Sequence, residues 1–275
     1  ASDRPACELV ASRGSSSRCT SSIPADSINR NPKCAPMPAR STLGDHSAAV
    51  CRQLGNRLGR RLWDERNHLP LLTSIDPTRH PPLAQLAIAA SPRPPLRVWM
   101  AGVTPTYSIE AGRLASASSA AQVIGQTYLT VNTTVEQLSH TLLQQRPDVV
   151  VVVGGYDTQS LATHRPLHIL STLIAGAIQR MPRRSRPAVF YAGNHWAAPE
   201  VETILQSTDM YAATVPNVMP TAAVVRQDAL VKALDDYYWQ LCHRLDGFGL
   251  LERWHTSPAA MTTIEANFIR LVQMW

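Results

Sequence analysis

Two glycines and an aspartate follow the most apolar stretch of the sequence. Gly154, Gly155 and Asp157 come directly after the five consecutive valines Val149–Val153. Glycine lets a backbone turn sharply and approach a ligand closely, and the Asp157 carboxylate could accept hydrogen bonds from a ribose or hold a cation. The sequence contains neither GxGxxG nor GxxxxGK[ST], so the usual patterns of a phosphate-binding loop are missing. A tight turn capped by Asp157 is the simpler interpretation.

Other polar residues follow further apolar runs. Gly193, Asn194, His195 and Trp196 come after residues 188–192 and offer an amide, an imidazole and an indole. They could line a pocket, or they could form the turn that starts the next helix. The candidate ligand-binding residues of the whole chain are Gly102, Thr104, Gly154, Gly155, Asp157, Gly193, Asn194, His195 and Asn217.

No constellation typical of catalysis or metal binding is found in the sequence. His164 and His168 are four residues apart, but Arg-Pro-Leu lies between them and the glutamate of HExxH is missing. No nucleophile elbow occurs, and no serine or cysteine has a recognisable base beside it. Cys242 lies on the apolar side of an expected helix, which indicates a core position. We therefore predict no catalytic residue, no metal and no cofactor, and we favour a protein that is not an enzyme.

The last two-thirds of the chain alternates between strand and helix patterns. Strands are expected at residues 96–103, 123–129, 148–153, 188–192 and 211–215. Helices are expected at residues 108–120, 133–146, 166–181, 199–205, 225–245 and 261–274. Ser108 is the expected N-cap of the first helix, and Thr133 with Glu136 resembles a capping box. Pro166 suits the first turn of its helix. Leu245 is expected on the inner side of the fifth helix, and Gly247 with Gly249 should end it.

This order predicts an α/β fold with a doubly wound, mostly parallel sheet of about five strands. We place that Rossmann-like domain at residues 96–250 and a C-terminal helical segment at residues 251–275. Ligands of such sheets bind outside the carboxyl ends of the strands. That rule selects the loops at residues 102–106, 154–160, 193–196 and 216–220.

The first third of the chain differs in composition. Residues 1–95 hold 13 Lys+Arg and 7 Asp+Glu, and they contain 12 of the 21 prolines and 4 of the 5 cysteines. We predict an irregular, basic extension with one helix within residues 47–66 and an extended connector from Pro70 to Pro95. Cys7, Cys19, Cys34 and Cys51 lack metal-ligand spacing, so unpaired thiols are expected. The positive charge is too diffuse to favour nucleic acid.

No stretch reaches the roughly 20 apolar residues of a membrane span, and the start of the chain does not resemble a secretory signal. We therefore expect a cytoplasmic protein. A protein partner or larger assembly is expected, because a cationic, proline-rich arm often becomes ordered only on a partner.

Several of these segments together resemble one family. From about Ala90 to Phe268 the chain is similar to part of the glutamate mutase L proteins. The matching segments are Leu96-Arg97-Val98 with Ala101-Gly102-Val103-Thr104-Pro105, Glu110-Ala111, Pro147-Asp148-Val149-Val150 with Gly154-Gly155-Tyr156-Asp157, Ala192-Gly193-Asn194 with Glu200-Val201, Pro216-Asn217-Val218-Met219-Pro220, and Thr256-Ser257-Pro258-Ala259-Ala260.

The resemblance implies an actin-like ATPase fold and a role as reactivating chaperone of adenosylcobalamin-dependent glutamate mutase. The family's two phosphate motifs, Asp-x-Gly-Ser-Thr and Asp-x-Gly-Gly, do not occur in these 275 residues. The family's Gly-Gly-Thr-Asp-Gly-Gly is here Gly-Gly-Tyr-Asp-Thr-Gln. We therefore expect only the α/β domain that lies between the phosphate motifs.

Three functions remain open. The first is a non-catalytic accessory subunit that binds a protein partner through exposed aromatic surface and its basic N-terminal arm. The second is a fragment of a reactivating chaperone whose ATP cleft is completed by another subunit. The third is a domain that binds a nucleotide or other small molecule at Gly154, Gly193 and Asn194. Cobalamin attached through histidine would need an Asp-x-His-x-x-Gly loop, which the sequence does not contain.

Overall fold

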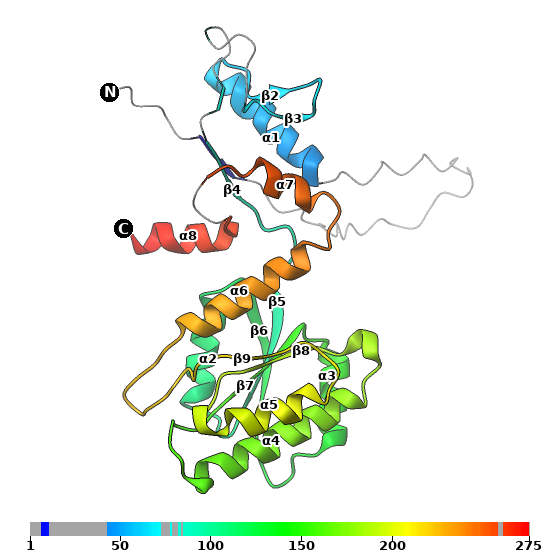
Figure 1. The fold of residues 1–275 in the computed structure, drawn as a ribbon, viewed down its shortest axis with the longest axis vertical. Coiled ribbons are helices and arrows are strands. Elements are labelled where there is room, and N and C mark those ends of the chain that lie inside the picture. The colour runs from blue at the N-terminus through cyan, green and yellow to red at the C-terminus, as the bar shows by residue number, and fades with distance from the viewer. Residues whose placement is uncertain are drawn as a thin grey trace, which may run out of the picture. The chain divides into compact units, whose positions relative to one another are not determined.

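The computed structural model describes residues 7–10, 43–72, 78, 82–83, 85–257 and 261–274 (Figure 1). These residues form two compact units. Pro94–Leu241 make up one, called here the sheet unit. The described residues up to Arg93 and from Cys242 onward make up the other, called here the terminal unit.

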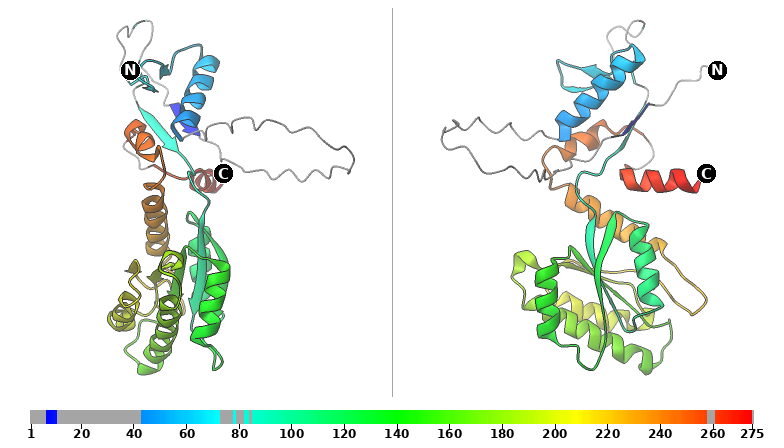
Figure 2. Two further views of the ribbon diagram at one scale, coloured as in Figure 1. Left: turned by 90° about the vertical axis from the view of Figure 1, so that its right-hand side faces the viewer. Right: turned by 180° about the vertical axis from the view of Figure 1, so that it is seen from behind.

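The sheet unit is built on five parallel strands in the order β6-β5-β7-β8-β9. Their bounds are β5 Leu96–Gly102, β6 Ala121–Tyr128, β7 Val149–Val153, β8 Ala188–Tyr191 and β9 Ala212–Thr214. All five strands lie where the sequence predicts them, and the predicted α/β fold class is confirmed. β5 and β6 are adjacent strands in Figure 2. All five valines of the central strand β7 are buried, as expected for a strand covered on both faces.

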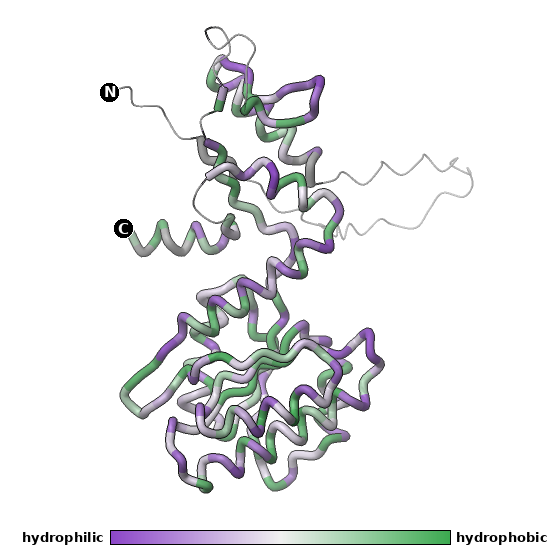
Figure 3. Tube along the Cα trace, in the orientation of Figure 1, coloured by the Kyte–Doolittle hydropathy of each residue, from purple (hydrophilic) through white to green (hydrophobic). Residues whose placement is uncertain are grey.

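Helices cover both faces of this sheet. The helices of the unit are α2 Ser108–Ala117, α3 Val135–Gln145, α4 Leu161–Gln179, α5 Ala198–Gln206 and α6 Asp228–Cys242, with short 3-10 turns at Arg183–Ser185 and His195–Ala197. α3, α4 and α5 contribute their apolar side chains to one core cluster together with Val150, Val152 and Tyr191. The alternation of hydrophobic and hydrophilic residues that produces these inner faces is visible along α4 and α5 in Figure 3.

Two predicted helix caps are wrong by one residue. Tyr107 precedes α2 as its N-cap, and Ser108 is instead the buried first residue of that helix. At α3 the Thr134 hydroxyl accepts from the backbone N of Gln137 at 3.3 Å. Thr133 lies one residue before this N-cap, and its hydroxyl instead accepts from the backbone N of Thr130 at 2.9 Å in the preceding turn.

The start of α4 was also predicted too late. The helix begins at Leu161, so Pro166 lies inside it rather than in its first turn. Ser160 is the N-cap, and its hydroxyl accepts from the backbone N of Ala162 at 3.3 Å. This cap adds a turn ahead of the proline, whose missing N–H removes one hydrogen bond from the helix.

The region after α6 differs from its prediction as well. α6 ends at Cys242, and Leu245 lies beyond it with 36% of its surface exposed. Gly247 has φ 81° and precedes a further helix, α7 Phe248–Trp254, which the sequence analysis did not predict. Gly249 therefore lies within a helix, so the prediction that it helps to end the preceding helix is wrong. Cys242 is fully buried, as its predicted core position requires.

The terminal unit combines both ends of the described chain. It contains β1 Cys7–Val10, α1 Leu43–Leu58, β2 Trp63–Asp64, β3 Leu69–Pro70, β4 Leu86–Ala89, α7 and α8 Ile264–Gln273. β1 pairs with β4, and α1 packs against α7. The backbone N of Leu86 donates to Thr256 Oγ1 at 2.8 Å, and that of Ile88 donates to His255 Nδ1 at 3.0 Å. The order of this region therefore comes from residues far apart in the sequence.

The predicted basic helix is shorter than expected at its C-terminal end. α1 ends near Gly59, which has φ 62° and lets the chain reverse, so Arg60, Arg61 and Arg66 do not lie on it. Cys51 of α1 is buried. Cys19, Cys34 and the side chain of Cys7 lie outside the described residues, as do parts of the proline-rich connector.

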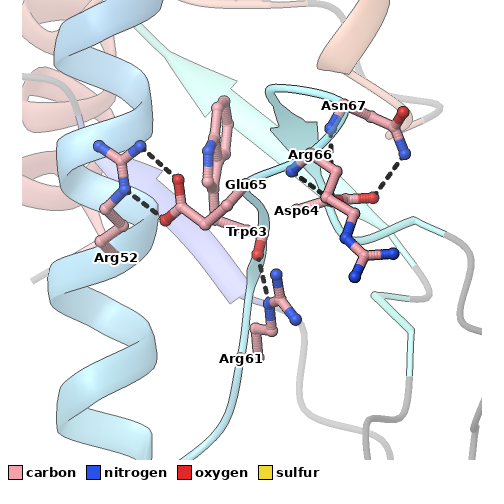
Figure 4. Close-up of polar contacts among 7 residues, drawn as sticks. All are labelled: Arg52, Arg61, Trp63, Asp64, Glu65, Arg66 and Asn67. Atoms are coloured by element: carbon pink, nitrogen blue, oxygen red, sulfur yellow. Dashed lines mark hydrogen bonds and ion pairs between the residues drawn. The ribbon is translucent and has the colours of Figure 1, made fainter.

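An arginine of α1 joins the helix to the β2–β3 hairpin (Figure 4). Arg52 donates from Nε and Nη2 to the two carboxylate oxygens of Glu65, at 2.7 and 2.8 Å. The same guanidinium lies 5.8 Å from the ring centre of Trp63, which meets Trp254 edge to face. The hydrogen bond from Arg52 lowers the pKa of Glu65 below its ordinary value. The contacts explain how α1, the hairpin and α7 form one unit.

Candidate functional site

The loops after β7, β8 and β9 meet at the carboxyl edge of the sheet, and Asp157 connects all three. Its Oδ1 accepts from the backbone N of His195 at 2.8 Å and from Nδ2 of Asn217 at 2.9 Å. Its backbone N donates to the carbonyl of Pro220 at 2.9 Å. The side chain thus ties its own loop to two others, in addition to any role in a local turn.

Asn194 is fully buried between the first two of these loops. Its Nδ2 donates to the carbonyl of Thr158 at 3.0 Å and to Thr163 Oγ1 at 3.3 Å. Its Oδ1 accepts from the backbone N of Trp196 at 2.7 Å, which caps the 3-10 turn His195–Ala197. These bonds occupy both side-chain N–H groups, so this amide holds the loops together and has no donor left for a ligand.

Asn217 performs the same task for the third loop. It is 3% exposed, and its Nδ2 donates to the carbonyl of Gly155 at 2.9 Å as well as to Asp157. Its Oδ1 accepts from the backbone N of Met219 at 3.0 Å. These bonds fix the loop after β9 to the loop after β7.

The glycines of the site permit close packing of backbone. Gly154 and Gly155 have φ of 142° and 69°, which side chains rarely allow. A Cβ on Gly193 would lie 2.8 Å from the carbonyl oxygen of Gly154. The three glycines thus allow the loops after β7 and β8 to touch.

The structure does not bring Gly102 and Thr104 into this group. Gly102 is the last residue of β5 and Thr104 follows the strand, and neither lines the pocket described below. A Cβ on Gly102 would lie 2.5 Å from Ile109 of α2, so this glycine lets the helix pack against the strand end. The Thr104 hydroxyl donates to the carbonyl of Thr106 at 3.4 Å, within its own loop.

A pocket of about 370 Å³ opens among the three connected loops. It is lined by Asp157, Gly193, His195, Ala198, Thr214, Val215, Pro216, Asn217, Pro220 and Arg226. Four of these are predicted candidates: Asp157, Gly193, His195 and Asn217. Arg226 was missed, because the sequence predicts a helix from residue 225, whereas α6 begins at Asp228. The backbone N of Arg226 donates to the carbonyl of Val218 at 2.8 Å, which folds this segment back onto the loop before it.

Tyr191, the last residue of β8, is hydrogen-bonded to the loop that follows this strand. Its ring is fully buried, and its hydroxyl donates to the carbonyl of Asn194 at 2.8 Å. Burial, with a smaller contribution from the charge of Asp157, raises the pKa of this phenol well above its ordinary value of 10.0. The folded protein therefore keeps Tyr191 protonated at a pH where an unfolded tyrosine ionises.

We expect Tyr191→Phe to lower the free energy of unfolding by about 1 kcal/mol at neutral pH, since one buried hydrogen bond is lost. Above about pH 10 the unfolded phenol loses its proton while the folded one retains it, so wild-type stability falls as pH rises. The variant lacks this loss, and its deficit should shrink with pH. Urea unfolding from pH 8 to pH 11 measures both effects.

Tyr128→Phe is the matched control, because Tyr128 lies on β6 with 42% of its surface exposed. We expect it to follow the wild-type pH dependence. A Tyr191→Phe deficit that stays constant up to pH 11 would contradict the assigned protonation of the phenol.

Among the described residues no group of three or more His, Cys, Asp or Glu is placed to hold a metal ion. None of the helices in this part of the chain is long and apolar enough to cross a membrane.

The fold and the loops define a parallel-sheet α/β domain whose polar residues gather at the carboxyl edge. The model of the MutL protein family matches residues 51–271. The chain therefore belongs to the MutL protein family, the glutamate mutase L proteins, as the sequence resemblance indicated. The match begins at Cys51, about 40 residues before the start that the resemblance gave, and so includes the second half of α1.

No curated protein matches the sequence. Among solved structures, the chain is similar to the signal receiver domain of the putative response regulator NarL from Mycobacterium tuberculosis, with 13% sequence identity and a TM-score of 0.33. That similarity covers 54% of this chain and 98% of the receiver domain.

Proposed function

We propose that this chain is a non-catalytic accessory protein of the MutL family that binds a protein partner through α8. The observation that carries the proposal is one face of that helix. Phe268, Leu271 and Val272 stand at positions i, i+3 and i+4, and 67%, 59% and 57% of their surfaces are exposed. This spacing places them on the same side of a helix.

The first turn of α8 is fixed to the terminal unit by polar contacts. The backbone N of Ile264 donates to the Ser91 hydroxyl at 3.2 Å, and that hydroxyl in turn donates to the Glu265 carboxylate. Thr262 forms a bridge with Ala89 at the end of β4. The helix is thus held at its start while its apolar side chains further along remain exposed.

The size of α8 favours a groove on a different protein over a second copy of the chain. A helix of 10 residues is about 15 Å long. Two such helices laid face to face would bury far less than the roughly 1,200 Å² typical of a stable interface. A groove that surrounds the helix buries more of each side chain, and the i, i+3, i+4 anchors are those of helix-in-groove recognition.

The absence of catalysis is proposed from the sequence. These 275 residues contain neither Asp-x-Gly-Ser-Thr nor Asp-x-Gly-Gly, the two motifs that the family resemblance associates with ATP phosphates. The residues gathered at the carboxyl edge are largely occupied in holding loops together. We therefore expect the purified chain to hydrolyse ATP no faster than background.

The decisive experiment is native mass spectrometry of the complex isolated without tags from its source. We expect the chain in a fixed ratio with a second protein, and we expect Phe268→Glu to reduce the bound fraction at least tenfold, because a charge would enter an apolar groove. Val131→Glu is the matched control, since Val131 is a fully exposed valine of the sheet unit. The same preparations are assayed for ATP hydrolysis.

The α8 interaction would be refuted if no second protein were found with the chain. It would also be refuted if Phe268→Glu left the same bound fraction as Val131→Glu. ATP turnover by the isolated chain would refute the non-catalytic role. Circular dichroism of each variant shows that folding is retained, which is expected because both side chains are exposed.

Family membership supports a second candidate function. In it the chain is part of a reactivating chaperone for an adenosylcobalamin-dependent mutase, with the ATP cleft supplied by another subunit. The same experiment separates the two, because this candidate requires the co-purifying protein to be such a mutase or an actin-like ATPase subunit.

A further inference from the structure

We propose that the pocket among the loops after β7, β8 and β9 binds a small phosphate ester that carries hydroxyl groups, such as a nucleoside monophosphate. The pocket lies entirely within the sheet unit, since its lining residues fall between Asp157 and Arg226. The proposal is independent of the α8 interaction.

The position and size of the pocket fit a ligand of this kind. It opens at the carboxyl ends of three parallel strands, the edge at which open α/β sheets bind ligands. Its volume of about 370 Å³ falls at the lower end of the range of small-molecule sites. Ala198, Val215, Pro216 and Pro220 contribute apolar surface against which the body of an organic ligand can pack.

Some polar side chains of the pocket are already hydrogen-bonded within the protein, which limits the groups that can contact a ligand. Both N–H groups of the Asn217 amide are bonded, to Gly155 and Asp157, and its oxygen accepts from Met219. Asp157 uses Oδ1 for two bonds within the protein, while no described residue donates to its Oδ2. A carboxylate oxygen can only accept, so the partner of Oδ2 must be a donor such as a ligand hydroxyl.

Arg226 provides the group for an anion. Its guanidinium forms no ion pair or hydrogen bond with any described side chain, although Asp157 lines the same pocket. The bond from its backbone N to Val218 fixes the start of this side chain at the pocket rim. The guanidinium matches the geometry of a phosphate with two parallel hydrogen bonds. His195 also lines the pocket and offers a further polar group to a ligand.

The pocket lining therefore combines a cation, a carboxylate oxygen that accepts no bond from a described residue, and apolar surface. A phosphate ester with hydroxyl groups uses all three, whereas inorganic phosphate would use the cation alone. This assignment differs from the small-molecule site expected at Gly154, Gly193 and Asn194, because the Asn194 amide is fully engaged within the loops.

The test is isothermal titration calorimetry of the full chain with adenosine 5′-monophosphate, ribose 5-phosphate and adenosine. We expect the monophosphate to bind with a Kd of about 1 mM or tighter and adenosine to bind at least tenfold more weakly. Arg226→Gln should weaken the monophosphate at least tenfold. Arg165→Gln is the matched control, because Arg165 is an exposed arginine of α4 outside the pocket.

Each outcome decides the proposal. Loss of phosphate-ester binding in Arg226→Gln, with binding retained in Arg165→Gln, supports it. Binding of ribose 5-phosphate as well as the monophosphate supports it too and assigns recognition to the sugar phosphate. Equal binding by both variants, equal binding of adenosine, or no binding of either phosphate ester overturns it. Arg226 is exposed, so the variant should fold, and its melting temperature checks this.

Discussion

Asn194→Ala is expected to lower the free energy of unfolding by about 3 kcal/mol, since three hydrogen bonds of a buried side chain are worth about 1 kcal/mol each. The amide bonds to the carbonyl of Thr158, the hydroxyl of Thr163 and the backbone N of Trp196, at 3.0, 3.3 and 2.7 Å. Alanine leaves these partners without the amide. Urea unfolding followed by circular dichroism measures the change.

Asn194→Ala should also loosen the structure locally, in the loop after β8. The Asn194 side chain joins the loop after β7 to the loop after β8, so its removal is expected to speed hydrogen exchange at the backbone N of Trp196, which it caps. The same exchange should remain slow in the centre of β7. This pattern would distinguish a released loop from general loosening of the core.

Asn132→Ala is the matched control. Asn132 is exposed in the connection between β6 and α3, and its truncation should change stability by no more than about 0.5 kcal/mol. A loss of less than about 1 kcal/mol in the free energy of unfolding of Asn194→Ala would show that this side chain does not hold the loops together. The bonds of Asp157 and Asn217 would then be sufficient to do so.

The strands of this chain and its α/β fold class could be predicted because their signals are local. A run of five valines bounded by Pro147 and Gly154 has one plausible place, the centre of a sheet covered on both faces. The helices that follow carry apolar residues at helical spacing, and right-handed crossovers then leave few arrangements.

The terminal unit could not be predicted because its contacts are far apart in the sequence. Leu86 and Thr256 exchange two hydrogen bonds across 170 positions. Trp63 and Trp254 meet edge to face although nothing in either segment indicates the other. Neither the N-terminal nor the C-terminal segment carries a sequence pattern that indicates the segment it contacts. The first third of the chain was therefore interpreted as an extension.

The candidate site was predicted in part for a similar reason. The rule that ligands bind at the carboxyl edge selected Asp157, His195 and Asn217, which do meet there. The rule does not predict which polar groups remain available to a ligand. That depends on hydrogen bonds between loops, which join residues 38 and 60 positions apart in the sequence. Arg226 was missed since its place depends on a backbone bond to Val218, which no side-chain pattern reports.

Gly125→Val is expected to lower the free energy of unfolding by about 3 kcal/mol, the upper part of the range for overpacked cores. Gly125 of β6 pairs with Trp99 of β5, and a Cβ there would lie 2.1 Å from Cζ3 of the Trp99 ring. Trp99 is 8% exposed and packs in the core with residues of α3 and α4, so its ring cannot move aside without disturbing them. Urea unfolding and near-ultraviolet circular dichroism measure the displacement.

A double-mutant cycle tests whether the Trp99 ring is the cause. Trp99→Leu removes the atoms that a valine at position 125 would strike, so the second substitution should cost at least 1 kcal/mol less in that background. Gln126→Val, at the exposed neighbouring position of β6, should change stability by no more than about 0.5 kcal/mol. Strict additivity of Gly125→Val and Trp99→Leu would show that the glycine does not accommodate this ring. Coupling would show that the absence of one side chain lets the edge strand β6 close over the core.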